Sequence, residues 1–174
     1  LMAARFNPNE QEIADLKNYF GTEKFSIIGD NVDVALNATK YPLSDNKFVV
    51  FHYKVNNNPV SKKLAFDKQT IKIDKNEILN TKAGNVNGNE VSELSVYLYE
   101  KSTRASEEIT KLTLVFVDKE ALRNEFKTIM PILKRQKMDD AAIKKYLIEY
   151  YYDFYGATDS KSINSFAGEV VKEQ

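Results

Sequence analysis

The chain contains no cysteine, and its only histidine is at position 52. The absence of cysteine excludes disulfides, thiolate nucleophiles and cysteine metal ligands. With one histidine, the paired-histidine motifs of ordinary zinc sites are excluded as well, so we expect no metal and no cofactor. There is also no GxSxG sequence, Walker loop, dinucleotide fingerprint or calcium loop. These absences favour a protein that is not an enzyme.

The chain also lacks an excess of either charge, with Lys+Arg 25 against Asp+Glu 25 in 174 residues. Because nucleic-acid-binding proteins normally carry a basic excess, we expect no nucleic-acid partner. No apolar run approaches the ~20 residues of a transmembrane helix, so no membrane span is predicted. The location stays open between the cytoplasm and an extracytoplasmic compartment, since a signal removed before Leu1 would leave no trace. Abundant asparagine and lysine suggest an AT-rich, bacterial genome.

Alternation of apolar and polar residues predicts a series of strands in the first two thirds of the chain. The strongest alternation covers 47–55, where apolar residues occupy most positions on both faces, as in a central strand. Residues 41–46 and 80–90 are predicted loops, and Pro59 closes a turn that begins at Asn56. The other predicted strands are 25–28, its candidate hairpin partner 32–36, then 63–66, 70–73, and the antiparallel pair 91–99 and 109–117.

Helices are predicted at both ends of the chain. The first covers 8–20 and has a narrow apolar stripe, which indicates an outer position. A second follows the cap Asp118, and Pro131 should kink or split it. A third runs from Asp139 to Tyr155, and the tail 157–174 is either flexible or a short amphipathic helix. This order predicts a single α+β domain over 1–174, with an N-terminal helix, an antiparallel sheet of about five to seven strands, and C-terminal helices packed on it.

The helix predicted at 139–155 is the most unusual segment. Helical spacing puts Ile143, Leu147, Tyr150 and Phe154 on one face. Further tyrosines flank that face and leave only a narrow polar stripe. A helix with this much aromatic surface must pack against a sheet of its own domain or against a partner.

Tyrosine has an apolar ring and a polar tip, which suits contact surfaces. We therefore expect a binding module that contacts a protein partner or a second copy of itself. The candidate residues are Tyr146, Tyr150, Tyr151 and Tyr155 on the helix, with Tyr97, Tyr99 and His52 on the strands. Ordinary core packing explains the same rings if they are buried.

Two other functions remain open. A carrier of a small apolar or amphiphilic molecule would need an enclosed, aromatic-lined cavity between sheet and helix. An enzyme using His52 would need a cleft at that residue and a neighbouring acid, and the spacing of the sequence identifies no such acid.

Overall fold

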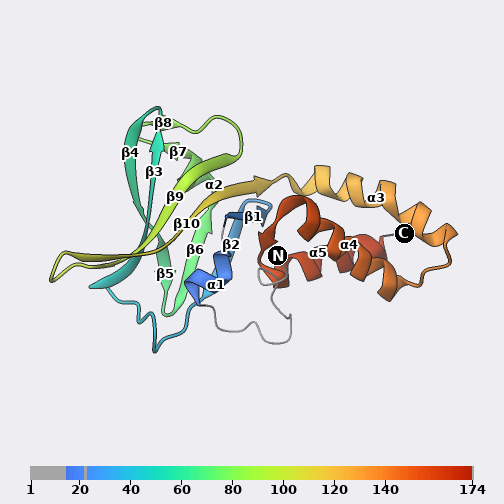
Figure 1. Cartoon of the computed structure of the whole chain (residues 1–174), viewed down its shortest axis with the longest axis horizontal. Helices are drawn as coiled ribbons and strands as arrows, with labels where there is room; N and C mark the ends of the chain where they lie inside the picture. The colour runs from blue at the N-terminus through green and yellow to red at the C-terminus, as the bar shows by residue number, and fades with distance from the viewer. Residues whose placement is uncertain (1–14, 22, 174) are drawn as a thin grey trace.

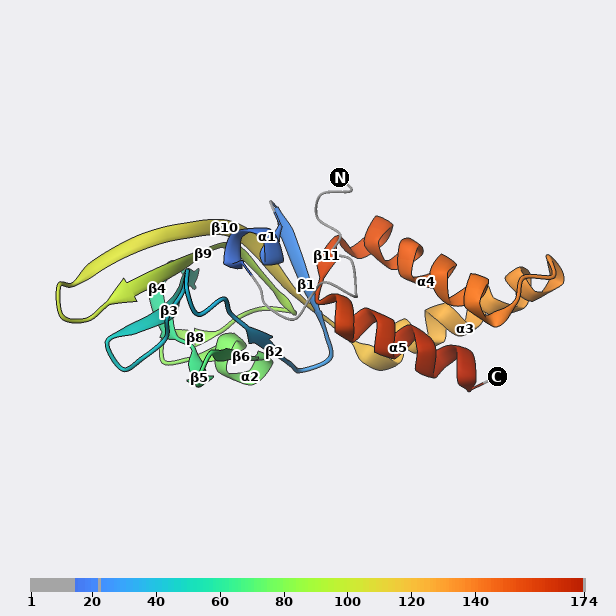
Figure 2. The same ribbon diagram turned by 90° about the horizontal axis from the view of Figure 1, so that it is seen from below.

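A computed structural model describes residues 15–21 and 23–173 of the chain. The strands gather at one end of the molecule, and α3, α4 and α5 lie together at the other (Figures 1 and 2). This arrangement confirms the α+β class with helices at the C-terminal end. The prediction of a helix over 8–14 lies outside the described residues.

The main sheet has six strands in the order β11-β1-β10-β9-β3-β4. The pairs β10–β9, β9–β3 and β3–β4 are antiparallel, but β1 is parallel to both β10 and β11, so the sheet is mixed. The main-sheet strands are β1 (Lys24–Ile28), β3 (Lys47–Val55), β4 (Asn58–Lys63), β9 (Glu90–Glu100), β10 (Ala105–Val117) and β11 (Ala157–Thr158).

Two smaller sheets complete the strand-rich end. Strand β2 was the candidate hairpin partner of β1, but after the turn at Gly29 it leaves the main sheet and pairs with β6. The predicted loop 80–90 contains a short hairpin, β7–β8. The strands of these sheets are β2 (Asn31–Ala35), β5 (Ala65–Asp67) and β6 (Thr70–Asp74), then β7 (Asn80–Thr81) and β8 (Gly84–Asn85).

The β3–β4 hairpin differs from the predicted turn over 56–59. Asn56 and Asn57 both have positive φ, at 52° and 67°, which makes a two-residue turn and lets β4 begin at Asn58. Pro59 lies inside β4, where it is tolerated because β4 is an edge strand. β3 pairs on both sides, as expected for a central strand.

The helices are α1 (Leu16–Phe20), α2 (Lys75–Leu79), α3 (Lys119–Arg135), α4 (Asp140–Tyr155) and α5 (Ser160–Lys172). In the described residues the first helix starts only after Asp15, which has an extended backbone and caps it. As expected for a helix on the outside of the domain, its apolar stripe packs inward while Lys17 and Asn18 are exposed. Tyr19 and Phe20 are buried, and their ring centroids lie 4.9 and 5.0 Å from that of Phe25.

Helix α3 continues through Pro131 and is not split. Proline removes the bond to the carbonyl four residues earlier, that of Lys127. Both residues are exposed, so water can satisfy that carbonyl. The tail forms α5, in which Ile163, Phe166 and Val170 are buried as the amphipathic pattern predicts.

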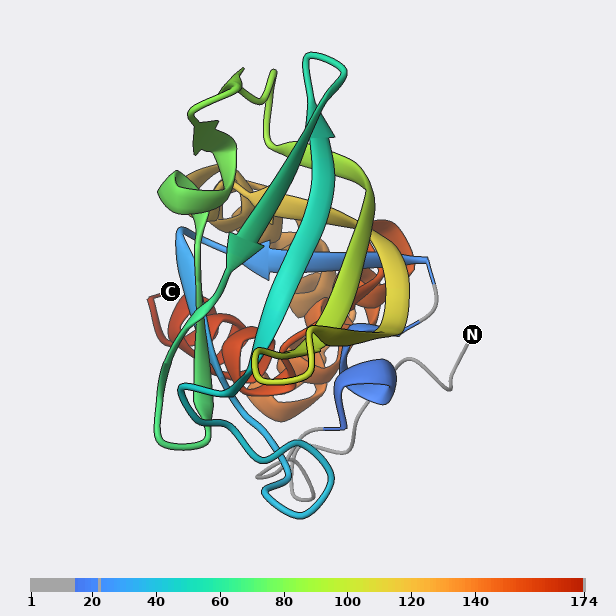
Figure 3. The ribbon, with the colours of Figure 1, turned by 90° about the vertical axis from the view of Figure 1, so that its left-hand side faces the viewer.

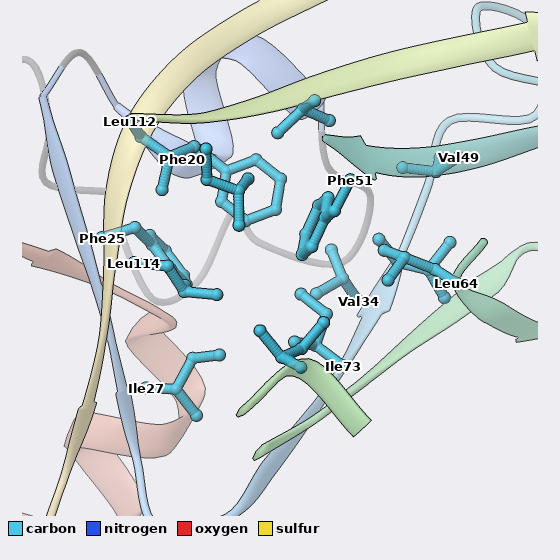
Figure 4. Packing of buried hydrophobic residues seen from close by; sticks show 14 of the residues in the cluster. Phe20, Phe25, Ile27, Val34, Val49, Phe51, Leu64, Ile73, Leu112 and Leu114 are labelled. Carbon is cyan, nitrogen blue, oxygen red and sulfur yellow. The ribbon is translucent and has the colours of Figure 1, made fainter. Parts of the chain in front are cut away.

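Two hydrophobic cores result from this arrangement. The first lies between the sheets and includes Phe20, Phe25 and Phe51 (Figure 4). The second joins α3, α4 and α5 around Phe126, Leu147 and other apolar residues. Residues at the ends of β1 and β10 also pack in the second core, so apolar contacts join the two halves of the molecule.

Phe51 tests the first core, since its side chain is fully buried on β3. We expect Phe51→Ala to lower the free energy of unfolding by about 3–5 kcal/mol, because it leaves a cavity. Urea unfolding followed by circular dichroism measures this. Lys54→Ala, on the exposed face of the same strand, should change stability by less than about 0.5 kcal/mol. Equal effects of the two changes would contradict the assigned core.

Candidate interaction surface

Helix α4 is defined by a residue at each end. The Asp139 side chain accepts a hydrogen bond from the Ala142 backbone N–H, which caps the first turn. Gly156 ends the helix with a φ of 82°, a conformation that disfavours other residues. The chain then turns directly into β11, which pairs with β1. Both ends are those predicted from the sequence.

The buried face of α4 differs from the predicted one. Ile143, Leu147 and Tyr151 are fully buried, whereas Phe154 is 67% exposed. Both sets follow helical spacing, so periodicity alone does not distinguish them. The pairing of β11 with β1 decides the rotation of α4, because it brings the Tyr151 face against the sheet. Tyr151 therefore cannot contact a partner directly, although we predicted it as a binding residue.

Tyr151 joins the helical end to the sheet through buried polar groups. Its hydroxyl lies 2.7 Å from Ser26 Oγ, and Ser26 Oγ donates to the Ala157 carbonyl at 3.1 Å. Since a serine hydroxyl has one hydrogen, the Tyr151 hydroxyl is the donor to Ser26. Thr158 Oγ1 donates in turn to the Ser26 carbonyl at 2.7 Å. These bonds connect α4, β11 and β1.

Two more tyrosines of α4 converge on one carboxylate of α3. The Tyr150 hydroxyl donates to Glu125 Oε1, and the Tyr155 hydroxyl donates to Glu125 Oε2 at 2.7 Å. Burial and then the bond to Glu125 raise the pKa of Tyr155 to about 12 and raise that of Tyr150 well above its usual range. Both tyrosines are partly buried and hold α3 against α4.

An outward row of rings remains on α4, and we call Tyr146, Tyr150 and Phe154 the aromatic ridge. Tyr146 is 47% exposed, and the Tyr150 and Phe154 ring centroids are 4.6 Å apart. Ile132 of α3 is also exposed, and helical spacing puts it on the same face of α3 as Glu125. The ridge is therefore an exposed apolar strip at the seam between two packed helices.

The predicted strand residues lie elsewhere, on the outer face of the main sheet. The His52 ring meets Tyr97 edge-on at 5.3 Å, and Tyr99 packs on Phe48 at 5.4 Å. Lys63 Nζ lies 4.2 Å from the centroid of the Phe48 ring. Cross-strand pairing of β3, β4 and β9 brings these side chains together. Sequence reasoning missed Phe48 and Lys63, because their proximity depends on strand register.

The structure thus divides the predicted site into two separate surfaces. Figures 1 and 2 show α4 and the outer part of β3 and β9 at opposite ends of the molecule. Negative charge on Glu108 raises the pKa of Tyr97, which stands opposite it across β9 and β10. One compact partner cannot contact both groups at once without wrapping around the sheet.

His52 is exposed, and its hydrogen-bond partner is the Ser61 hydroxyl, 2.9 Å from Nδ1. Serine and histidine at this distance resemble part of a nucleophile pair, but such a pair also needs a group that orients the histidine and donors for an oxyanion. Ser61 lies directly opposite His52 in the β3–β4 ladder, so ordinary cross-strand contact accounts for their proximity.

A pocket with a volume of about 550 Å³ lies where β1 meets α3 and α5. Its lining is mostly polar and includes Asp30, Lys119 and Glu169, with Phe166 as its one aromatic ring. It is open to solvent and differs from the enclosed aromatic cavity that a carrier of apolar molecules needs.

In residues 15–21 and 23–173 no helix is both long and apolar enough to cross a membrane. Within the same residues no group of three or more histidine, aspartate or glutamate side chains is arranged to hold a metal ion. The sequence matches no protein-family model and no curated protein sequence. Functional inference therefore depends on the two surfaces themselves.

The buried tyrosines predict the behaviour of the protein at high pH. Burial raises the pKa of Tyr151 to about 12, and burial together with the bond to Glu125 gives Tyr155 a similar pKa. A raised folded-state pKa means that the unfolded chain loses these protons first. Their contribution to stability is thus complete below pH 10 and is lost as the pH rises from about 10 to 12.

Absorbance at 295 nm should show tyrosines titrating near pH 12, and the melting temperature should fall between pH 10 and 12. Tyr151→Phe removes the Ser26 bond and should cost about 1–2 kcal/mol at pH 7. It should also weaken the alkaline dependence. A Tyr146→Phe control should change neither property. If Tyr151→Phe titrates and melts like the parent, Tyr151 is not buried as described.

Proposed function

We propose that this protein is a non-catalytic interaction module that contacts a protein partner through the aromatic ridge of α4. The observation that carries the proposal is the exposure of Phe154 and Tyr146 on a helix whose opposite face is anchored in a core. Exposed large apolar rings in a contiguous strip are characteristic of contact surfaces.

The chemistry of the ridge suits such a contact. Aromatic residues are enriched at interfaces and dominate their binding energy, since each ring loses little conformational freedom. The rings of Tyr146, Tyr150 and Phe154 are spaced by one helical turn, the arrangement that a helix presents to an apolar groove. The bond of Tyr150 to Glu125 fixes the central ring before any partner arrives.

A carrier of a small apolar molecule is the second candidate. The one feature in its favour is the aromatic content of α4, and in the described residues those rings either pack in a core or face outward. An enzyme using His52 ranks below both, because that residue is an exposed partner of Ser61.

A pull-down from source-organism lysate tests the proposal, with quantitative mass spectrometry of the captured proteins. The variant Tyr146→Ser with Phe154→Ser should lose a partner that the parent protein captures, because deletion of a hot-spot ring weakens binding by about 2 kcal/mol or more. Both positions are exposed, so circular dichroism should show an unchanged fold.

The matched control is Tyr97→Ser with Tyr99→Ser, which removes two rings from the sheet surface. It should keep the same partner. Loss of the partner from the control alone would move the contact to the sheet and overturn the role of the ridge. Sedimentation of the purified protein distinguishes a second copy from another protein. Native mass spectrometry that shows a bound small molecule, with no protein partner, would favour the carrier.

A further inference from the structure

Strand β4 offers a second, different kind of surface, because it is an edge of the main sheet. Its only described neighbour in that sheet is β3. In a hairpin with a two-residue turn, the residue pair nearest the turn is joined by backbone hydrogen bonds. Pairs with and without such bonds then alternate along the two strands. Asn58, Val60 and Lys62 therefore bond toward β3. The backbone N–H groups of Ser61 and Lys63 point away from it.

The free edge of β4 faces a groove rather than open solvent. Residues 59–62 of β4 form one wall, and residues 80–83 of the β7–β8 hairpin form the other. The volume of this groove is about 460 Å³. Figure 3 shows β4 on the side of the sheet that faces α2 and this hairpin. The Tyr53 hydroxyl of β3 donates to the Ile78 carbonyl at 2.7 Å, which holds α2, the helix that leads into the opposite wall, against the sheet.

The charges of the groove are of one sign. Lys62 lies on one wall and Lys82 on the other, and the lining contains no aspartate or glutamate. Lys82 is exposed and Lys62 is half-buried, and neither forms a salt bridge with the described acidic side chains. Lys63 adds a third positive charge on the outer face of the same strand. The rest of the lining is divided between polar and apolar residues, which are Ser61, Asn80 and Thr81 on one hand and Pro59, Val60 and Ala83 on the other.

We propose that this groove binds an extended acidic peptide segment, which adds to the main sheet as a strand beside β4. The free backbone groups of β4 would bond to the peptide main chain, the source of affinity in this mode of recognition. Because successive side chains of a strand point to opposite faces, acidic residues at alternate positions of the peptide would meet Lys62 and Lys82.

Lysine and proline on an edge strand also protect against aggregation, and β4 carries Lys62, Lys63 and Pro59. Protection of the edge against aggregation does not explain why the β7–β8 hairpin forms a second wall beside it. Nor does it explain why that hairpin carries Lys82. Proline has no backbone N–H, so Pro59 removes only the first of the donors that would point away from β3. The next outward donor, Ser61, lies within the groove.

Fluorescence anisotropy tests the proposal with a labelled peptide that alternates glutamate and valine. A second peptide has the same residues but is N-methylated at every backbone amide, which keeps its charge and prevents strand pairing through either edge. A third probe is a short single-stranded oligodeoxynucleotide. We expect the first peptide to bind and the other two to bind at least about tenfold more weakly, a difference of about 1.4 kcal/mol.

Two variants locate the site. Ser61→Pro removes a free N–H, and Lys82→Glu reverses a charge without touching β4. Each should weaken binding of the alternating peptide about tenfold or more. Lys145→Glu, the same charge change on exposed α4, should leave it unchanged. Circular dichroism checks the fold of Ser61→Pro, and Lys82→Glu provides an independent test if that variant unfolds.

Three results would overturn the proposal. The first is absence of measurable binding by the alternating peptide. The second is equal binding of the N-methylated peptide or the oligodeoxynucleotide, which would show general attraction of anions. The third is unchanged binding by the Lys82→Glu variant. None of these results affects the aromatic ridge, which lies on a different element.

Discussion

The buried hydrogen bond between Tyr151 and Ser26 is the contact on which the arrangement of the molecule depends. Apolar side chains of β1 and β10 also pack in the helical core, but apolar burial has little directional preference of its own. Ser26 lies on β1, where Thr158 and Ala157 of β11 also bond to it. A buried hydroxyl without a partner costs about 1–3 kcal/mol, so these groups favour the arrangement in which all are satisfied.

This contact also determines which surface of α4 is available. Once Tyr151 is against β1, Ile143 and Leu147 face the helical core by helical spacing. The rings on the other side, Tyr146 and Phe154, then have no core to enter. The exposed aromatic ridge is thus a consequence of the junction as well as of the aromatic composition of the helix.

Local signals predicted much of the fold. Asp139 and Gly156 mark the ends of α4, Asp118 marks the start of α3, and alternation located β3, β9 and β10. These features depend on residues close together in the sequence, where capping and periodicity act directly.

The predictions that failed have a different physical origin, because they concern contacts between residues far apart in the chain. The parallel pairing of β1 with β10 and β11 joins segments about 90 and 130 residues away, and no local pattern encodes it. The buried face of α4 was misassigned for the same reason, since two aromatic stripes have equivalent spacing. The groove beside β4 depends on the contact of two hairpins and was not predicted.

The two faces of α4 differ in their exposure to solvent, and a partner protein would contact only the exposed face. This difference in exposure is the central claim. Fluorotyrosine labelling followed by ¹⁹F NMR with a soluble paramagnetic agent measures it directly. The Tyr146 resonance should broaden strongly, while that of Tyr151 should stay sharp until the protein unfolds. Equal broadening of both, or protection of Tyr146 in the isolated monomer, would contradict the division of α4 into an anchored face and an exposed one.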